Sequence, residues 1–249
     1  EVEKYNDVNV MGTAYMLEIL ANSNHNVKKI VVASSRAIYG EGKYNCETHG
    51  VQYPSQRKEE DMEKGEFNPK CSICNSTLNV VPTDEQSKIH PSSIYGINKQ
   101  QQEQMVMLMG ELLSIPSVAF RYQNVYGPGQ SLSNPYTGIL SIFSTRILNG
   151  NNLDIYEDGK ETRDFIYIED VVDATILGIE KEEANGQIFN IGSGIATTVL
   201  DVANTLKRLY NSEININVKG KFRLGDIRHN FADLSKSKDI LGFIPKYHF

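Results

Sequence analysis

Residues 28–35 are Lys-Lys-Ile-Val-Val-Ala-Ser-Ser. The short continuous apolar run 30–33 favours a β-strand that is buried on both faces, as strands in parallel sheets are. Upstream of it, residues 8–20 place their apolar side chains at helical spacing. A helix is therefore predicted to lead into a buried strand, and that strand ends in two serine hydroxyls.

The same alternation of helix and strand continues along the chain. Further helices are predicted at 95–113, 138–149, from 169 onward, and at 198–210; further strands at 118–122, 153–156, 165–168 and 187–192. This order predicts an α/β fold, a doubly wound parallel sheet of Rossmann type with helices on both faces. We expect residues 1–130 to form the C-terminal part of that sheet domain, with residues 41–90 as an insertion. Residues 131–249 are expected to form mainly a smaller mixed α/β region, with some segments returning to the sheet.

Composition excludes several classes of protein. The chain has 249 residues, a formal charge of −6 and 40% hydrophobic residues, which suit a globular protein with a real core. The acidic balance argues against a nucleic-acid partner. No apolar run approaches the roughly 18 residues of a membrane span. The three cysteines cannot form a disulfide framework, so reduced thiols or a metal site are expected.

Residues 41–90 interrupt the alternation with a polar segment that holds all three cysteines. A stretch of this length without a long periodic pattern is predicted to be an insertion. It contains Cys46-x-x-His49 and Cys71-x-x-Cys74, and two such pairs predict one tetrahedral, structural zinc site. The alternative is three incidental thiols and a surface histidine. Zinc and reduced thiols together favour the cytoplasm.

A possible catalytic pair begins the helix predicted at 95–113. Tyr95 and Lys99 are four residues apart and so share one helix face. A nearby ammonium favours the phenolate, so we expect a lowered Tyr95 pKa and a general base. Alone, the pattern also fits an exposed helix face. Ser35 strengthens the catalytic interpretation because ligands bind outside the carboxyl ends of parallel strands, although Ser35 could also serve as a turn cap.

With these residues the chain resembles the extended short-chain dehydrogenase/reductases, specifically the NAD-dependent nucleotide-sugar epimerases and dehydratases. The resemblance extends over nearly the whole chain. It is carried by the segments 9–13 (Asn-Val-Met-Gly-Thr), 34–40 (Ser-Ser-Arg-Ala-Ile-Tyr-Gly), 95–99, 121–129, 163–171 (Arg-Asp-Phe-Ile-Tyr-Ile-Glu-Asp-Val), 189–194 and 223–226 (Arg-Leu-Gly-Asp).

The resemblance implies a role for each matching residue. The catalytic residues are Ser35, Tyr95 and Lys99. NAD is expected to contact Asn9, Ser34, Tyr95, Lys99 and Tyr122. The nucleotide-sugar substrate is expected to contact Ser35, Asn124, Arg163, Arg223 and Asp226. The two arginines suit a pyrophosphate because a guanidinium binds it bidentately, although each could instead form a surface salt bridge.

The resemblance also implies a reaction. Sugar 4,6-dehydratases carry an Asp-Glu pair where this chain has Arg36 and Ala37, so an epimerase is favoured. Residues 127–138 and 155–159, together with the insertion, most resemble dTDP-L-rhamnose 4-epimerases, which form dTDP-6-deoxy-L-talose. Gln123 departs from the more usual Phe. The alternatives are a UDP-glucose or UDP-N-acetylglucosamine 4-epimerase, a reductase, or a non-catalytic zinc-ribbon binding module on a degenerate Rossmann scaffold.

Other features concern the limits of the chain and its surface. The Gly-rich dinucleotide turn of the family is absent and is expected upstream of residue 1, so we expect an N-terminally truncated fragment that is inactive alone.

Family members often form homodimers through the helix of Tyr95; Met105, Val106, Met109 and Leu112 suit either such an interface or the core. Glu103 and Glu111 are predicted on solvated faces, and His25, His90, His229 and His248 receive no role.

Overall fold

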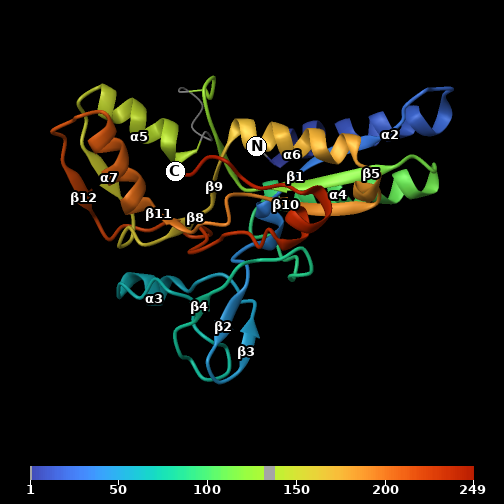
Figure 1. Cartoon of the computed structure of the whole chain (residues 1–249). Helices are drawn as coiled ribbons and strands as arrows, with labels where there is room; N and C mark the ends of the chain where they lie inside the picture. The colour runs from blue at the N-terminus through green and yellow to red at the C-terminus, as the bar shows by residue number, and fades with distance from the viewer. Residues whose placement is uncertain (1, 132–137) are drawn as a thin grey trace.

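The computed structural model describes residues 2–131 and 138–249. Its central sheet contains three parallel strands, β1 (Ile30–Ser35), β5 (Ser117–Tyr122) and β10 (Gln187–Ile191), in the order β1-β5-β10 (Figure 1). Ser35 pairs with Tyr122, which in turn pairs with Ile191. The carboxyl ends of the three strands therefore meet at one edge of the sheet, as the sequence predicted for a doubly wound fold.

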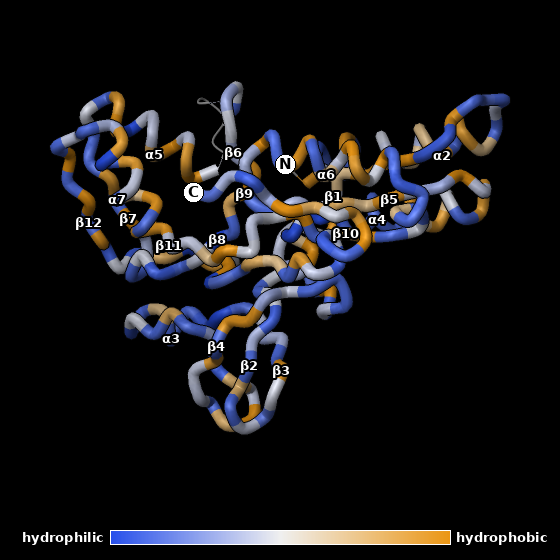
Figure 2. The backbone as a smooth tube through the Cα atoms, viewed as in Figure 1, coloured by the Kyte–Doolittle hydropathy of each residue, from blue (hydrophilic) through white to orange (hydrophobic). Residues whose placement is uncertain are grey.

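Helices cover both faces of this sheet. Ala119 of β5 packs with Leu17 of α2 (Gly12–Asn22) and Val106 of α4 (Ile94–Leu112). Its neighbours Val118 and Phe120 pack on the other face, against α6 (Ile168–Glu180). The β5 strand is almost completely buried, which explains the continuous apolar run of residues 118–120 within it. In Figure 2 hydrophobic colouring runs along the strands of this sheet.

A second core lies beside the sheet. It forms where α5 (Ile139–Leu148) and α7 (Val199–Leu209) pack on β7 (Leu153–Ile155), which pairs in parallel with β12 (Ile216–Val218). The remaining elements of the described chain are short: α1 (Val2–Tyr5), η1 (Asn6–Met11), η2 (Arg36–Tyr39), β6 (Asn124–Tyr126), β8 (Thr162–Arg163), β9 (Phe165–Tyr167), η3 (Glu182–Ala184), β11 (Thr197–Thr198) and η4 (Ser237–Leu241). Among the described residues, no helix is long and apolar enough to cross a bilayer.

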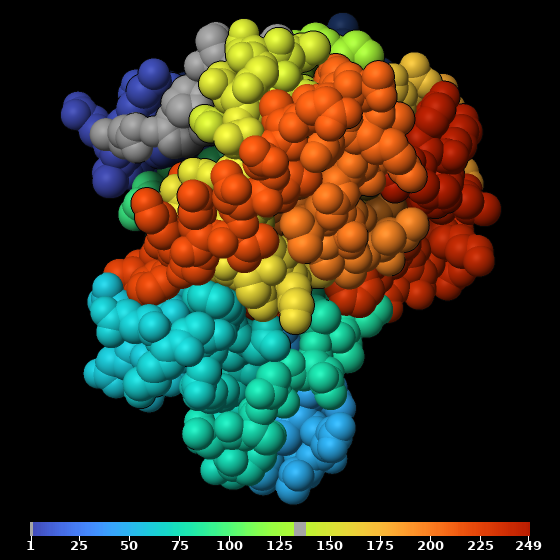
Figure 3. All heavy atoms as spheres, turned by 90° about the vertical axis from the view of Figure 1, so that its left-hand side faces the viewer, coloured from blue at the N-terminus to red at the C-terminus, as the bar shows by residue number. Residues whose placement is uncertain are grey.

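The Cys-containing segment forms a small lobe below the sheet. It contains an antiparallel sheet in the order β3-β2-β4, made of β2 (Tyr44–Cys46), β3 (Gly50–Gln52) and β4 (Asn79–Val80), and the short helix α3 (Glu59–Glu63). Figure 3 shows this lobe protruding from the rest of the molecule. These elements were not predicted, because strands of two or three residues are too short to show an alternating pattern.

A buried ion pair joins α4 to the central sheet. The Arg121 guanidinium of β5 donates to both carboxylate oxygens of Glu103, at 2.6 and 3.0 Å, and the Ser34 hydroxyl of β1 donates to the same carboxylate at 2.6 Å. Arg121 also donates to Tyr39, whose hydroxyl contacts Asn190 of β10. Glu103 is only 2% exposed, so the prediction of a solvated Glu103 was wrong: its charge is balanced inside the protein rather than by water.

Replacing Glu103 tests this ion pair. Glu103→Ala leaves the buried Arg121 guanidinium without its carboxylate, so we expect the free energy of unfolding to fall by about 3–5 kcal/mol. The matched control is Glu111→Ala on the same helix, where the side chain is exposed and a change within about 0.5 kcal/mol is expected. Equal effects of the two variants in urea denaturation would contradict the account.

Candidate active site

A cleft of about 840 Å³ opens at the carboxyl ends of β1 and β5. It brings together eight of the predicted site residues, from segments far apart in the chain: Ser34, Ser35, Tyr95, Lys99, Tyr122, Asn124, Arg163 and Asp226. A larger hollow of about 1050 Å³ lies at the opposite edge of the sheet, beside Ser117 and Ile188, and contains none of them. The predicted site residues therefore gather at the carboxyl ends of the strands, as expected for this fold, and not in the larger hollow.

The start of α4 determines where Tyr95 lies. The Ser93 side chain caps the helix by accepting a hydrogen bond from the Gly96 amide at 3.0 Å. A Cβ atom at Gly96 would lie 2.6 Å from the Ala37 carbonyl oxygen and 2.9 Å from Pro91 Cβ. Only glycine therefore allows α4 to approach η2 this closely, and this approach places the Tyr95 side chain beside Ser35.

The expected lowering of the Tyr95 pKa by Lys99 was wrong for this chain. Loss of surrounding water raises the pKa of Tyr95, while a hydrogen bond with Ser35 and the charge of Arg36 act in the opposite direction. Lys99 Nζ lies 5.9 Å from the centre of the Tyr95 ring and donates to the Ala33 carbonyl at 2.9 Å. Lys99 is not among the groups that change the Tyr95 pKa, which is set first by burial.

Ser35 forms the turn cap that the sequence offered as one of two alternatives, while its catalytic role stays a prediction. Its side chain caps η2 by accepting a hydrogen bond from the Ala37 amide at 3.2 Å, and it lies close enough to Tyr95 to act against the rise in the Tyr95 pKa. Neighbouring Ser34 is fully engaged in a different way, because its hydroxyl donates to Glu103. The two serines thus face different sides of the strand, and Ser35 is the one that meets Tyr95.

Arg36 also lines the cleft. From the sequence, it served only to disfavour a dehydratase, because it stands where dehydratases carry an acidic residue. Burial, together with the charge of nearby Arg163, lowers its pKa to about 9, although Glu41 and Asp226 act in the opposite direction. Arg163 in turn donates to the backbone carbonyls of Thr162, Ile227 and Arg228. Neither guanidinium forms a salt bridge with a carboxylate of the described residues. Carboxylates such as Asp226 act on both guanidiniums without a direct salt bridge. The two neighbouring cations therefore suit this part of the cleft to an anion.

Two predicted ligand-binding residues do not line the cleft. Asn9 lies in η1, beside α4. Arg223 lies over the Tyr156 ring at 4.7 Å and donates to the Tyr156 hydroxyl at 3.4 Å. Both assignments stay predictions. The motif stretch 127–138 is also only partly placed, since residues 132–137 lie outside the described residues.

Gln123 and Asn124 follow β5 at the floor of the cleft. Gln123 is 5% exposed, and neither its amide oxygen nor its amide nitrogen has a partner among the described residues. The Asn124 side-chain oxygen is also buried without a partner. Unsatisfied amide groups are costly inside a protein, so this part of the cleft has unused capacity for hydrogen bonds.

A network of buried charges connects the lobe to the cleft. Arg57 of the lobe forms a salt bridge with Glu157 at 2.8 Å and donates to the Asp226 backbone carbonyl at 2.7 Å. Arg228, which is 1% exposed, pairs with Glu157 and Asp158 and donates to the Asn68 side chain at 2.9 Å. No sequence signal predicts Arg57, because its partners lie 100 and 169 residues away.

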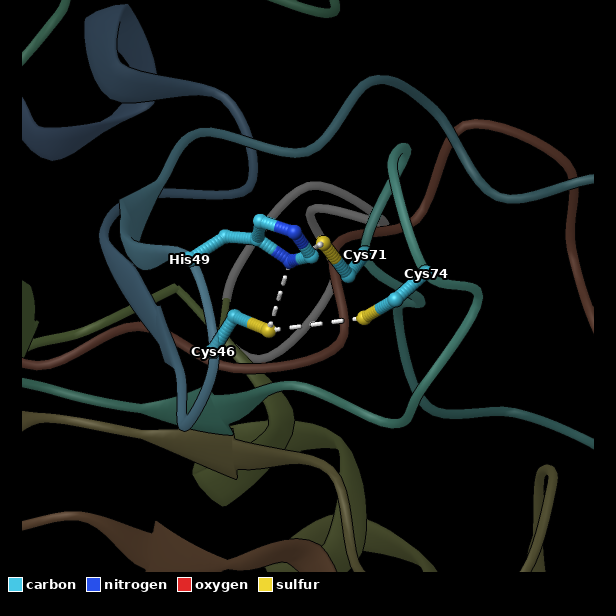
Figure 4. Close-up of side chains that lie close together, drawn as sticks. All are labelled: Cys46, His49, Cys71 and Cys74. Carbon is cyan, nitrogen blue, oxygen red and sulfur yellow. Dashed lines mark hydrogen bonds between the residues drawn. The ribbon is translucent and has the colours of Figure 1, made fainter.

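The four predicted zinc ligands converge in the lobe (Figure 4). One ligand atom from each of Cys46, His49, Cys71 and Cys74 lies within 4.8 Å of all the others. Cys46 and Cys71 are buried, Cys74 is exposed, and the three thiols are free. None of the four lines the cleft. The pairing of the two Cys motifs predicted this convergence, while the metal itself stays a proposal.

Comparison with known proteins gives these residues a context. Residues 1–192 match the NAD dependent epimerase/dehydratase family. The chain belongs to this family. It is 36% identical over 248 residues to a dTDP-L-rhamnose 4-epimerase of Burkholderia thailandensis, covering 99% of this chain and 66% of the relative. It is 30% identical to a putative UDP-glucose 4-epimerase of Methanocaldococcus jannaschii, covering 96% of this chain and 65% of the relative.

A solved structure has the same fold. The UDP-glucose 4-epimerase of Thermotoga maritima, determined with UDP-glucose, has a TM-score of 0.78 and 30% identity and covers 100% of this chain and 67% of its own. The chain thus spans about two thirds of the length of the relatives it matches. Family membership and the Rossmann-like parallel fold, both predicted from the motifs, are confirmed.

His229 offers a test of the charge network beside the cleft. Burial lowers its pKa to about 3, helped by the charge of Arg228, and it shares a 3.0 Å hydrogen bond with Thr162. Between about pH 6.5 and 3 the unfolded chain binds this proton and the folded chain does not, so stability falls as pH falls. From pH 6.5 to 5 this contributes up to about 2 kcal/mol.

The measurement is urea denaturation at pH 6.5 and pH 5. We expect His229→Asn to lose less stability than the wild type over this interval, because asparagine keeps a hydrogen bond to Thr162 but does not titrate. The matched control is His25→Asn, at an exposed position. If His229→Asn and wild type lose the same free energy, the buried neutral histidine is refuted.

Proposed function

We propose that the protein is a nucleotide-sugar 4-epimerase that uses NAD. The observation that carries this proposal is the meeting of Ser35, Tyr95 and Lys99 in one cleft with the unpaired guanidiniums of Arg36 and Arg163. A hydroxyl pair supports proton transfer at a sugar hydroxyl, and the two cations support binding of a diphosphate. A non-catalytic scaffold has no need for both features together.

The identity of the residues after Ser35 favours epimerisation over dehydration. Elimination of water needs an acid and a base near the sugar, and Arg36 and Ala37 supply neither. Epimerisation at C4 needs a hydride to leave C4 and return to its opposite face, which bound NAD would supply, and it needs the C4 hydroxyl to lose and regain a proton. Tyr95 removes this proton, the Ser35 hydroxyl holds the sugar oxygen in place, and Tyr95 returns the proton after the keto sugar has turned over.

We expect NAD to bind on one side of the cleft. Residues 1–130 are proposed to belong to the NAD-binding part of the protein, with Ser34, Tyr95, Lys99 and Tyr122 toward the cofactor and Asn9 nearby. The fit is supported by Tyr95 and Lys99, whose hydroxyl and ammonium line the cleft at the strand ends, where the fold class binds dinucleotides. When bound, NAD supplies the oxidation and re-reduction of C4.

The substrate proposal is dTDP-L-rhamnose, converted to dTDP-6-deoxy-L-talose. It rests on the resemblance of residues 127–138 and 155–159 and on the Burkholderia relative. Arg163, Asn124 and Asp226 are proposed to bind the substrate inside the cleft, and Arg223 from beside it. The second candidate is a UDP-sugar 4-epimerase, which the Methanocaldococcus and Thermotoga relatives favour.

The assembly proposal is a homodimer in the cytoplasm. Exposed apolar side chains gather on two helices that pack together, α2 and α4; they include Tyr15, Met16, Ile19, Leu108 and Leu112. Val106, by contrast, is 4% exposed and belongs to the core, and Met105 and Met109 pack against that core. Leu112 therefore suits the interface, while the other three residues considered from the sequence are structural.

Tyr95→Phe tests the proton-transfer role. Removing one hydroxyl should lower kcat about 10²–10⁴-fold with little change in KM or in thermal unfolding, because the ring remains in place. The matched control is Tyr210→Phe at the exposed end of α7, which should leave kcat unchanged. Assays use full-length protein with NAD⁺ added. If Tyr95→Phe retains wild-type kcat, the proposed function is wrong.

A comparison of sugar nucleotides tests the substrate. We expect dTDP-L-rhamnose to be epimerised without net consumption of NADPH, and with a kcat/KM at least about tenfold above that of UDP-glucose or UDP-N-acetylglucosamine. A higher kcat/KM for either UDP-sugar would move the assignment to the second candidate. Stoichiometric consumption of NADPH would instead identify a reductase.

A further inference from the structure

We propose that Cys46, His49, Cys71 and Cys74 together bind one structural Zn²⁺ ion that joins the two turns of the lobe. The four side chains come from two turns separated by more than twenty residues, yet their ligand atoms all lie within 4.8 Å of one another. Figure 4 shows the sulfur atoms and the imidazole directed toward a common centre. The proposal concerns a site outside the cleft and is independent of the proposed function.

The distances match a tetrahedral site. With Zn–S near 2.3 Å and Zn–N near 2.0–2.1 Å, a tetrahedron places two sulfurs about 3.8 Å apart and a sulfur and a nitrogen about 3.6 Å apart. Cys46 Sγ lies 3.7 Å from Cys74 Sγ and 3.6 Å from His49 Nδ1. Cys71 Sγ lies 3.6 Å from the same His49 nitrogen. These separations are those of ligands around one ion.

The backbone forms both turns. Cys46 ends β2 and pairs with Gly50, which begins β3 in a left-handed conformation (φ 68°), so His49 lies in the hairpin turn. In the second turn, the Asn75 amide donates to the Cys71 carbonyl at 2.9 Å, and the Cys71 amide donates to the Ser76 carbonyl at 2.8 Å. Each turn therefore presents two ligands on the same side.

Apart from its contacts with the rest of the protein, the lobe has only a small sheet and a small apolar cluster to stabilise it. Its strands contain two or three residues each. Its buried apolar cluster consists of Tyr44, Cys46, Cys71 and Leu78, so half of that cluster is ligand cysteine. A sheet of this size is not stable from burial alone and usually requires a disulfide or a metal. Three thiols allow at most one disulfide, whereas one zinc ion uses all four residues.

The number and type of ligands identify the role of the metal. Four protein ligands leave no open position for water or substrate, so the site is structural rather than catalytic. Three thiolates and a neutral imidazole around Zn²⁺ carry a net charge of −1, and binding releases the thiol protons. Thiolate sulfur favours zinc over magnesium or calcium.

The position of the two turns gives the metal a consequence beyond the lobe. The segment between them carries Arg57 and Asn68, which contact Glu157, Arg228 and the Asp226 carbonyl. A metal that joins the two turns fixes both ends of this segment. We therefore expect its loss to loosen residues 44–80 while the central sheet keeps its structure.

The test uses the full chain purified without chelator in a reducing buffer. We expect one zinc per chain by elemental analysis after gel filtration. Replacement by Co²⁺ should give the visible and near-ultraviolet absorption of tetrahedral cobalt with thiolate ligands. Removal of zinc should increase amide hydrogen exchange in residues 44–80, with exchange in β1, β5 and β10 unchanged.

Variants assign the ligands. His49→Ala should lose stoichiometric zinc, His49→Cys should retain it with a four-thiolate cobalt spectrum, and Cys71→Ser should lose it. The matched control is Ser72→Ala, an exposed non-ligand position in the second turn, which should bind zinc like the wild type. Protein that takes up no zinc under reducing conditions, or zinc that persists in both His49→Ala and Cys71→Ser, would overturn the proposal.

Discussion

The ion pair between Glu103 and Arg121 holds the candidate site together. Glu103 lies on the helix of Tyr95 and Lys99, while Arg121 lies on the central strand, so one contact fixes the helix against the sheet. Ser34 joins the pair from β1. Burying two charges is costly unless every hydrogen bond is made, and here the bonds reach all three strands. The start of α4 and the carboxyl ends of the central strands are therefore held in a fixed relative position.

The cleft that results contains two arginines close together. Arg36 and Arg163 face it without carboxylate partners among the described residues, and water exclusion around Tyr95 raises its pKa. A phenol in this environment gives up its proton more readily once further positive charge approaches. Under the proposed function, the chain positions Tyr95 as the base, and the cofactor that binds in the cleft completes its activation.

The central sheet and the grouping of Ser35 with Tyr95 could be predicted from the sequence, because buried strands and helices are periodic and their order determines where strand ends meet. Glu103 could not, since helical spacing does not show which polar residue meets a buried arginine. Arg57 could not either, because its partners are distant in sequence. The strands of the lobe are too short for a pattern, but the spacing of Cys46, His49, Cys71 and Cys74 predicted their meeting.

The most direct test of the account is proton NMR of the reaction in D₂O with full-length protein and NAD⁺. An epimerase that moves hydrogen between C4 and a bound cofactor keeps that hydrogen out of contact with solvent. We therefore expect the C4 epimer of the sugar nucleotide to accumulate with protium retained at C4. Incorporation of deuterium at C4, or recovery of only the starting sugar nucleotide from an otherwise folded enzyme, would contradict the central claim.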